Sequence, residues 1–463
     1  MSFLERIRPA KIAEVAALRK IFAANPAARP DNFPVRDFVA ALRAGSGIIA
    51  EVKRTSPSRP DLRRLGPVEA LAKAYRRGGA CALSLVTDRE HFGTSLDDVA
   101  YLRAAVDLPV LTKDFIIDPV QIRAAWAAGA DAILLIVSML DPATLADLLA
   151  EARSLGLAAL VETHSADEID TALAAEADLV GVNNRDLGSL TTDLAHGEAL
   201  LPRIPDGVVT VTESGLDGRA DVDRMAAAGA DAFLIGHALL LDPDPGRKVA
   251  EMAGRLAVDA RWVKVCGLTD PSDARQAHEA GADALGLIFA DSPRQVDEAM
   301  VRRIRDEVPD ARLCGVFMGQ DPREVSRIAR ACDLDLVQLH GHESPADCAL
   351  VSATSGLPVV KVLRPDEATA ETVGAFDTAA YFLVDRPKGG DPEVTGEDLI
   401  AAAVRLREAG GKVLLAGGLD PANVAGAIAA AEPFGVDVAS GVESEPGRKD
   451  HGAVSRFIRE AKA

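Results

Sequence analysis

Charged side chains end four apolar runs in the first half of the chain, and these runs are alternate members of a longer series. Glu51 and Lys53 end the first run, Lys113 the third, Glu162 the fifth and Glu213 the seventh. Lysines and glutamates that meet at one site keep each other ionised, whereas burial moves their pKa values toward neutrality, as general acids and bases require. One charge at the end of a run is usually a solvated rim residue, but recurrence at alternate runs predicts a catalytic site.

The runs that carry these charges have the length and composition of buried parallel strands. They are nearly continuous in Val, Ile, Leu and Ala, and helical patterns such as "PVQIRAAWAA" separate them. Eight runs begin near residues 47, 80, 108, 131, 156, 178, 207 and 231, and eight more extend from "WVKVCG" to "GVDVASG". We predict an α/β protein of two consecutive (β/α)8 TIM barrels, the first with an N-terminal helical extension. A pair of open doubly wound sheets is the alternative.

The pentapeptide AGADA occurs three times, at residues 128–132, 228–232 and 280–284. In each copy an Ala-rich helical segment ends at Gly, which tolerates the left-handed conformation, and an apolar run follows. The spacings of 100 and 52 residues are close to multiples of roughly 25 residues, about one βα unit. AGADA is therefore predicted to be a helix-to-strand joint.

The length and charge of the chain limit its organisation and its partners. Because 463 residues exceed one ordinary core, we place two domains at residues 1–256 and 260–463. The formal charge of −19 argues against nucleic-acid and anionic-membrane partners, and no segment has transmembrane or signal-peptide character. The five cysteines contain no CxxC pair, so we expect no disulfide frame or zinc site, and a cytoplasmic protein: Cys81, Cys266, Cys314, Cys332 and Cys348.

Small residues follow the last two runs of each half. In such barrels the loops after strands seven and eight are the usual phosphate cradle, because small residues let backbone N–H groups approach the oxygens. The predicted cradle residues are Ser214, Gly215 and Gly236 in the first half and Gly417, Gly418, Ser440 and Gly441 in the second. Two cradles suggest two reactions on phosphorylated sugars, although glycine pairs also serve ordinary turns.

Two further groups in the second half have chemical potential. Cys266 ends its first run and Asp385 its sixth, so a thiol and a carboxylate could share proton abstraction and delivery. The alternative for Cys266 is a small buried hydrophobe. "HGHE" at His340–Glu343 imitates an HxH metal pair, but neither half offers the additional His and Asp ligands, so we expect no metal.

These residues belong to motifs that resemble two known families. The first half resembles indole-3-glycerol phosphate synthase through "IIAEVKRTSPS", "LPVLTKDFIIDPVQI", "ALVETHS", "VGVNNRDL", "VTESGL" and "LIGHALL". The second half resembles phosphoribosylanthranilate isomerase through "VKVCGLTDPSDA", "SPRQV", "VQLHGHE", "LLAGGLDPANV" and "VASGVESEPGRKD". Together the motifs cover nearly the whole chain, and the arrangement resembles the fused bifunctional enzymes of tryptophan biosynthesis.

The resemblance implies that the second barrel acts first. It would convert N-(5-phosphoribosyl)anthranilate into its 1-deoxyribulose isomer by an Amadori rearrangement, with Cys266 as general base at the sugar C2 proton. Asp385 would be the general acid that opens the furanose ring, and Arg294 would hold the anthranilate carboxylate. Gly418 and Gly441 would belong to the phosphate cradle, and His340 is also placed among the binding residues.

The first barrel would then close the indole ring with loss of carbon dioxide and water. By the resemblance, Lys113 protonates the substrate carbonyl as the ring carbon attacks, and Glu162 assists the dehydration. The other implied roles are these: Lys53 binds carboxylate or phosphate, Glu51 and Glu213 tune the lysines, Asn183 orients a sugar hydroxyl, Arg185 binds substrate, and Pro57, Phe92, Phe115 and Leu187 form the anthranilate pocket. Neither reaction requires a cofactor, and we expect a monomer.

Two segments and one residue depart from the family patterns. "SPSRPDL" places Pro60 where the synthases usually have glycine, and His237 stands where a small or acidic residue is more usual. "VDRPKGGDPEVTG" interrupts the usual glycine-rich loop of the isomerases after Asp385, so if one activity is weakened we expect it to be the isomerase. The alternatives are a chain with one working barrel and an inactive phosphosugar-binding module, which would have no use for the Lys and Glu groups at the mouth.

Overall fold

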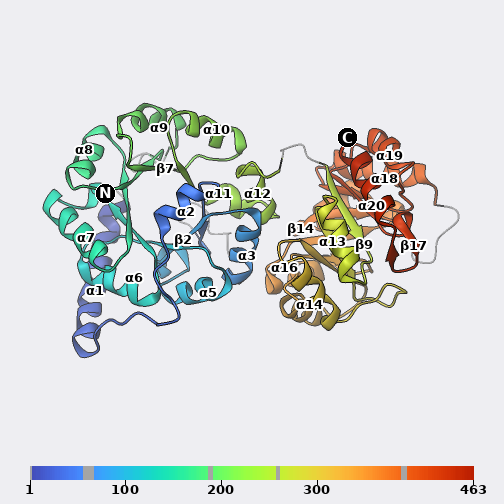
Figure 1. The fold of residues 1–463 in the computed structure, drawn as a ribbon, viewed down its shortest axis with the longest axis horizontal. Coiled ribbons are helices and arrows are strands. Elements are labelled where there is room, and N and C mark those ends of the chain that lie inside the picture. Colours follow the sequence, from blue (N-terminus) through green and yellow to red (C-terminus); the bar gives the residue numbers. More distant parts are fainter. Residues whose placement is uncertain (1–2, 56–66, 186–190, 257–260, 387–393) are drawn as a thin grey trace. The chain divides into compact units, whose positions relative to one another are not determined.

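The computed structural model of the chain describes residues 3–55, 67–185, 191–256, 261–386 and 394–463. The chain divides into two compact units, Met1–Val258 and Asp259–Ala463 (Figure 1). Pro57, Pro60 and Leu187, and the segment 387–393, lie outside the described residues. Within the described ranges, no helix combines the length and the apolar character that crossing a bilayer requires.

The first unit is a closed barrel of parallel strands in sequence order. Ile48, Ile49 and Ala50 of the first strand pair with the eighth strand, which closes the ring. The strands are β1 (Ile48–Val52), β2 (Ala82–Val86), β3 (Val110–Lys113), β4 (Ala132–Ile136), β5 (Ala158–Thr163), β6 (Leu179–Asn183), β7 (Val209–Glu213) and β8 (Ala232–Ile235). This closure confirms the predicted barrel and excludes an open doubly wound sheet.

Helices surround this barrel, and two of them precede its first strand, as predicted (Figure 1). The helices are α1 (Phe3–Ala24), α2 (Phe38–Ala44), α3 (Val68–Gly78), α4 (Arg89–Phe92), α5 (Asp97–Ala105), α6 (Pro119–Ala128), α7 (Pro142–Ser154), α8 (Ala166–Ala174), α9 (Leu194–Leu200), α10 (Arg219–Ala227), α11 (His237–Leu241) and α12 (Pro245–Met252). Several begin at an Asp-Pro pair: the Asp118 carboxylate accepts a hydrogen bond from Val120 N, and Pro119 takes the first helical position.

The second unit is also a closed parallel barrel, in which the first strand pairs with the last. Its strands are β9 (Trp262–Cys266), β10 (Ala284–Ile288), β11 (Leu313–Phe317), β12 (Leu336–Leu339), β13 (Val359–Leu363), β14 (Ala379–Val384), β15 (Val413–Leu415) and β16 (Gly435–Val438). Its helices are α13 (Pro271–Glu279), α14 (Glu298–Glu307), α15 (Pro322–Ala331), α16 (Pro345–Ser355), α17 (Ala370–Ala375), α18 (Gly396–Glu408), α19 (Val424–Ala431) and α20 (His451–Lys462). A hairpin of β17 (Glu443–Glu445) and β18 (Arg448–Lys449), which the sequence did not predict, follows β16.

The aspartate of each AGADA joint binds the start of the preceding strand. A fourth aspartate, in the sequence "DLDLV", makes the same contact. The hydrogen bonds run from Val110 N to Asp131 (2.9 Å), from Thr210 N to Asp231 (2.8 Å), from Val263 N to Asp283 (2.8 Å) and from Leu313 N to Asp335 (2.8 Å). The pentapeptide is therefore a helix-to-strand joint that also fastens neighbouring strands at their amino ends.

Strand residues of one parity fill the interior of the first barrel. Ile49, Leu111, Leu160 and Val211 belong to one buried cluster, whereas residues of the opposite parity, such as Ile48, pack with the surrounding helices in another. Successive side chains on a strand point to opposite faces, so the residue two places after each interior residue also faces inward. This parity decides which side chains reach the mouth of the barrel.

Candidate active sites

Four of the five charges at the ends of the odd strands lie at inward-facing strand positions of the first barrel. Glu51, Lys113, Glu162 and Glu213 each stand two places after one of the interior apolar residues, at the carboxyl end of a strand. The three glutamates are buried. The fold thus gathers at one mouth residues that are up to 162 positions apart (51 to 213) in the sequence.

Two lysines pair with these carboxylates. Lys113 Nζ donates a hydrogen bond to Glu213 and lies 3.5 Å from Glu162 Oε2. Lys53 Nζ donates to Glu51 Oε1. Burial alone would lower the pKa of Lys113, but Glu213, Glu162 and Glu51 outweigh burial and raise it. Lys113 is therefore a protonated ammonium held among buried carboxylates, which is the state of a general acid.

The carboxylates of the mouth have different proton affinities. Burial, with the charge of Glu162, raises the pKa of Glu213 to about 7 although Lys113 opposes it. Burial also acts on Glu162 and Glu51, but Lys113 lowers the pKa of the first, and Lys53 with Lys113 lowers that of the second. Two close carboxyls whose pKa values separate in this way can divide acid and base roles between them.

His164, which was not among the residues predicted from the sequence, extends this network. Its Nε2 lies 3.4 Å from Glu162 Oε1, and its Nδ1 lies 3.4 Å from Glu168 Oε2. Burial lowers the pKa of His164, but the contacts with Glu168 and Glu162 outweigh burial and raise it. A histidine directly after a strand that ends in a catalytic candidate was the available signal.

The ends of β6 and β7 hold the next predicted residues. Asn183 is buried, and its Oδ1 accepts a hydrogen bond from Arg185 N (3.0 Å). The neighbouring Asn184 Nδ2, which was not predicted, donates to the carbonyl oxygens of Glu213 and Ser214, both at 3.0 Å. Asn184 thereby fixes the turn that leads into the predicted phosphate cradle.

The cradle residues of the first barrel have unusual backbone or steric environments. Ser214 and Gly215 both have positive φ, 68° and 81°. A Cβ atom on Gly236, directly after β8, would overlap the carboxylate of Glu51. Gly236 is therefore required for the close approach of β8 to the mouth charges, whatever its part in phosphate binding.

The predicted aromatic residues lie on two adjacent segments. Phe92 ends α4, and its carbonyl oxygen accepts hydrogen bonds from Arg54 N and Thr55 N, both at 3.0 Å. Phe115 follows β3 and packs partly against the interior cluster that contains Leu134. These contacts fix the segment after β1 to α4.

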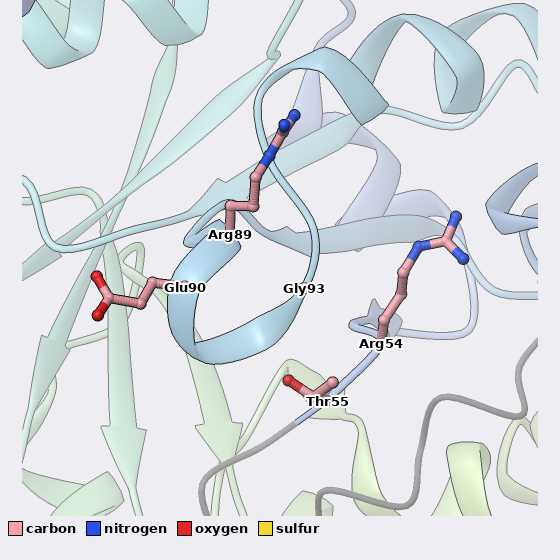
Figure 2. Close-up of a pocket in the computed structure, with 5 residues that line it drawn as sticks. All are labelled: Arg54, Thr55, Arg89, Glu90 and Gly93. Carbon is pink, nitrogen blue, oxygen red and sulfur yellow. The ribbon is translucent and has the colours of Figure 1, made fainter.

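A pocket of about 300 Å³ lies between that segment and α4. Its lining residues are Arg54, Thr55, Arg89, Glu90 and Gly93, none of which was among the predicted site residues. Figure 2 shows that the Glu90 side chain points away from the two arginines. Arg89 also pairs with Asp97 at 2.7 Å.

A buried lysine ties the N-terminal helix to the mouth. Lys11 of α1 is 2% exposed, and its Nζ lies 2.6 Å from Asp114 and 3.3 Å from Asp88. Asp114 directly follows Lys113, and its other oxygen accepts a hydrogen bond from the Thr87 hydroxyl (2.7 Å). The helix is thus joined by charge to the loops after β2 and β3.

In the second barrel, Cys266 and Asp385 also occupy inward-facing positions at the carboxyl ends of their strands, β9 and β14. Trp262 and Tyr381 belong to the interior cluster, and the two candidates stand four places further along the same parity. Cys266 is 6% exposed, and burial raises the pKa of its thiol although Lys264 opposes this. Burial raises the pKa of Asp385 to about 6.

His340 and its neighbours complete this mouth. Its Nε2 lies 3.7 Å from Asp385 Oδ2, and its Nδ1 is 3.1 Å from Gln338 Nε2. Burial, together with the positive charge of Lys264, lowers the pKa of His340 to about 4, so its imidazole is neutral. His342, the other histidine of "HGHE", has an 80% exposed side chain and points elsewhere. Across the described ranges, no group of three or more His, Cys, Asp or Glu residues is arranged to hold a metal ion.

Arg294 is held in place by a carboxylate that the sequence did not predict. Its Nε and Nη2 donate to the two oxygens of Glu443 at 2.8 and 2.6 Å. Glu443 also accepts from Lys449 Nζ (2.8 Å), which in turn donates to the Cys266 carbonyl oxygen (2.6 Å). One edge of the guanidinium is thus fixed to the hairpin β17–β18, while Nη1 has no partner among the contacts within the described chain.

The predicted cradle of the second barrel follows β15 and β16. Gly417 and Gly418 both have positive φ, 86° and 94°, which side chains other than glycine rarely adopt. Ser440 and Gly441 begin a short 3-10 turn, and a Cβ on Gly441 would overlap the carbonyl oxygen of Leu419. The loops after these two strands therefore pack closely together.

Two closed parallel barrels with acid–base groups and small residues at the carboxyl ends of their strands define a chain of two TIM-barrel enzymes. The family model of indole-3-glycerol phosphate synthase matches residues 4–252, and that of N-(5'phosphoribosyl)anthranilate (PRA) isomerase matches residues 263–460. The chain therefore belongs to the family of fused tryptophan biosynthesis enzymes, with the synthase domain first and the isomerase domain second. It is a bifunctional enzyme, a decarboxylating lyase and an isomerase.

Individual relatives match either nearly the whole chain or its first half. The tryptophan biosynthesis protein TrpCF of Yersinia pestis is 39% identical over 431 residues, which cover 90% of this chain and 85% of that protein. The multifunctional tryptophan biosynthesis protein of Phycomyces blakesleeanus is 32% identical over 93% of this chain but only 64% of its own length. The indole-3-glycerol phosphate synthase of Mycolicibacterium smegmatis is 48% identical over 220 residues, 47% of this chain and 81% of that protein.

Proposed function

We propose that the second barrel carries out its isomerisation with Cys266 as general base and Asp385 as general acid. Asp385, whose pKa is raised to about 6, donates its proton to the furanose ring oxygen of N-(5-phosphoribosyl)anthranilate as the ring opens. The Cys266 thiolate then removes the proton from the sugar C2, and the resulting enol becomes the 1-deoxyribulose ketone. The placement of both groups on inward-facing ends of β9 and β14 carries this assignment.

Binding residues of the second barrel are proposed from the same mouth. The free edge of the Arg294 guanidinium would take the anthranilate carboxylate, because Glu443 occupies only Nε and Nη2 among the described contacts. The neutral His340 would donate a hydrogen bond near Asp385. Gly417, Gly418, Ser440 and Gly441 would surround the phosphate with backbone N–H groups.

For the first barrel, we propose that Lys113 is the general acid of ring closure. Its ammonium protonates the substrate carbonyl as the aromatic carbon attacks, and carbon dioxide leaves from that carbon. Glu162, 3.5 Å from the same ammonium, then assists loss of water. The convergence of Lys113, Glu162 and Glu213 at one mouth is the observation that carries this proposal.

The remaining residues of the first mouth would bind and orient the substrate. Lys53 and the loops at Ser214, Gly215 and Gly236 would meet the anionic groups, and Asn183 and Arg185 a sugar hydroxyl and the phosphate. Phe92 and Phe115 would border the anthranilate ring; Pro57 and Leu187 are proposed with them from the motif alone.

We further propose functional domains at residues 1–256 and 260–463 and a monomeric, cytoplasmic enzyme. Each barrel holds its acid and its base within one chain, so neither site needs a partner subunit. All five cysteines are free and buried, as suits a reducing compartment. Light scattering coupled to size-exclusion chromatography tests the oligomeric state, and the mass of a dimer would refute the proposed monomer.

Separable loss of the two activities tests the residue assignments. Glu162→Gln should remove synthase turnover and leave the isomerase unchanged, whereas Cys266→Ala should do the reverse. Purified full-length protein is supplied with each substrate in turn, and anthranilate-type fluorescence and indole formation are followed. Glu198→Gln, which alters a carboxylate that pairs with Arg224 between the surrounding helices α9 and α10, is the matched control for Glu162→Gln. If either substitution silenced both reactions equally, two independent sites would be the wrong picture.

A further inference from the structure

A fully buried ion pair lies beneath the mouth of the second barrel. Lys264 is 0% exposed, and its Nζ is 3.0 Å from both carboxylate oxygens of Asp437. The two residues are direct neighbours across β9 and β16. Both interrupt otherwise apolar strands, "WVKVC" and "GVDV".

Stability alone does not account for this pair. Removing two charges from water costs several kcal/mol per ion, and well-packed apolar residues of similar volume are often as stabilising or more so. The rest of this interior shows that apolar packing is available, because Trp262, Leu336 and Leu414 fill the same cluster. The pair is therefore expected to act on something that it faces.

The strand order places Lys264 nearer to Cys266 and Asp437 nearer to Asp385. Cys266 is two residues after Lys264 on the same inward face of β9, and the lysine interacts with the thiol through its charge and a side-chain hydrogen bond. Asp385 directly follows β14, and the strand order from there is β14, β15, β16, β9. Asp437 on β16 is therefore one strand nearer to Asp385 than Lys264 on β9 is. The cation is thus on the side of the base, and the anion is on the side of the acid.

We propose that the Lys264–Asp437 pair is an oriented dipole that positions the protons of the isomerase site, favouring the thiolate of Cys266 and the neutral carboxyl of Asp385. This inference rests on the proposed base and acid roles of those two residues. A lysine alone would favour ionisation of both groups, and an aspartate alone would favour protonation of both. Only an oriented pair supplies opposite fields to a base and an acid in one interior.

The electrostatic balance at each group agrees with this orientation. Burial is the largest influence on Cys266 and raises its pKa; Lys264 opposes burial more strongly than Asp437 reinforces it. Burial likewise raises the pKa of Asp385, and there Asp437 acts more strongly than Lys264. The order of the two charges is therefore reversed between the base and the acid.

Other charged and titratable groups also face these two residues. Those near Cys266 are Cys314 of β11, Arg294 and Lys449; those near Asp385 are His340 and Arg386. Glu443 pairs with both Arg294 and Lys449 and offsets one of their two positive charges, and His340 is uncharged at neutral pH. Lys264 and Asp437 are thus the charges whose removal separates the two effects.

The test is the pH dependence of Cys266 alkylation by iodoacetamide in the full-length enzyme. The reactive species is the thiolate, and the Cys266→Ala chain gives the background from the other four cysteines. Lys264→Met should raise the midpoint of the alkylation profile, and Asp437→Asn should lower it, each by about one pH unit. The isomerase kcat/KM should fall in both variants, with its optimum displaced to higher pH in the first and to lower pH in the second.

Matched variants distinguish this effect from a loss of packing. Lys361→Met removes another buried lysine of the same barrel, which pairs with Glu343 at 2.9 Å, and should leave the Cys266 midpoint unchanged. The apolar pair Lys264→Met/Asp437→Leu should restore thermal stability but not isomerase activity. Thermal unfolding of the second unit reports whether that barrel is folded, whereas synthase activity reports only the amount of folded first unit.

Two outcomes would overturn the proposal. The first is that Lys264→Met and Asp437→Asn displace the midpoint of Cys266 alkylation in the same direction, or that neither substitution displaces it. The second is full isomerase activity in the apolar double variant. Failure of the catalytic assignment itself is recognised separately, because Cys266→Ala would then retain isomerase activity.

Discussion

Substitution of Lys11 tests whether the N-terminal helix is a working part of the synthase. Lys11→Met keeps most of the buried hydrocarbon but removes the ammonium that lies 2.6 Å from Asp114 and 3.3 Å from Asp88. Breaking a buried pair typically costs about 3 to 5 kcal/mol, because the partner carboxylate stays buried without compensation. Asp114 keeps its bonds from Thr87 and Phe115, so the lower end, about 3 kcal/mol, is expected here.

That loss should appear as earlier thermal inactivation of one activity. For a unit of this size, about 3 kcal/mol lowers the unfolding midpoint by about 6 to 12 °C. Full-length protein is heated in steps, and residual synthase and isomerase activities are measured in the same samples. The synthase curve should move, and the isomerase curve should not. Residual synthase turnover at 25 °C should also fall, because Asp114 is adjacent to Lys113.

Arg19 supplies the control for this experiment. It lies on the same helix and pairs with Asp118, but its side chain is 66% exposed, and exposed pairs contribute at most about 1 kcal/mol. In the double variant Lys11→Met/Asp114→Asn the nearer of the two uncompensated carboxylates is gone, so its destabilisation should be smaller than the sum of the single effects. Equal inactivation temperatures for Lys11→Met and Arg19→Met would refute the reasoning.

Two other substitutions have outcomes fixed by the same structure. In Asp385→Asn, isomerase activity should vanish, and the second unit should become more stable at pH 8 by about 1 to 3 kcal/mol. The reason is that the pKa of this carboxyl rises from 3.8 to about 6 on folding, so the wild-type carboxyl destabilises the folded state as the pH increases through that interval. Urea unfolding at pH 8 and pH 4 checks this, and an equal gain at both values would contradict it. In Gly236→Ala, the new methyl overlaps the Glu51 carboxylate, so synthase kcat/KM should fall by about 10²-fold with the isomerase unaffected. Gly218→Ala, where a Cβ meets nothing within 4 Å, is its control, and equal synthase rates in the two variants would show that the overlap is harmless.

The barrels themselves could be predicted from the sequence because their evidence is local. The length of a run such as "AILLIV" predicts the length of the strand, and its continuous apolar composition predicts burial on both faces. The residue that ends such a run lies at the mouth, because the carboxyl ends of all strands of a TIM barrel meet there. Glu51, Lys113, Glu162 and Glu213 were found in this way. The period of two along β9 would also have placed Lys264 beside Cys266, since a charge inside an apolar strand is informative in itself.

The contacts between distant segments could not be predicted in the same way. Lys11 stands in a helix whose other polar residues are mostly exposed, so nothing local marks it as buried against Asp114. Glu443 reaches Arg294 only because the hairpin β17–β18 follows β16, and no apolar run signals so short a hairpin. Such residues are identified by pairing across 100 or more positions, which periodicity does not encode.

The aspartates at the helix-to-strand joints bear on how these barrels assemble during synthesis. Each one binds an amide only 20 to 22 residues earlier, so both partners have left the ribosome once a single repeat has emerged. Contacts of short sequence separation form fast, whereas pairing of β1 with β8, nearly 190 residues away, must wait for the final repeat. A growing chain can therefore hold an ordered, still open row of strands, and only the last seam of each ring depends on a completed domain.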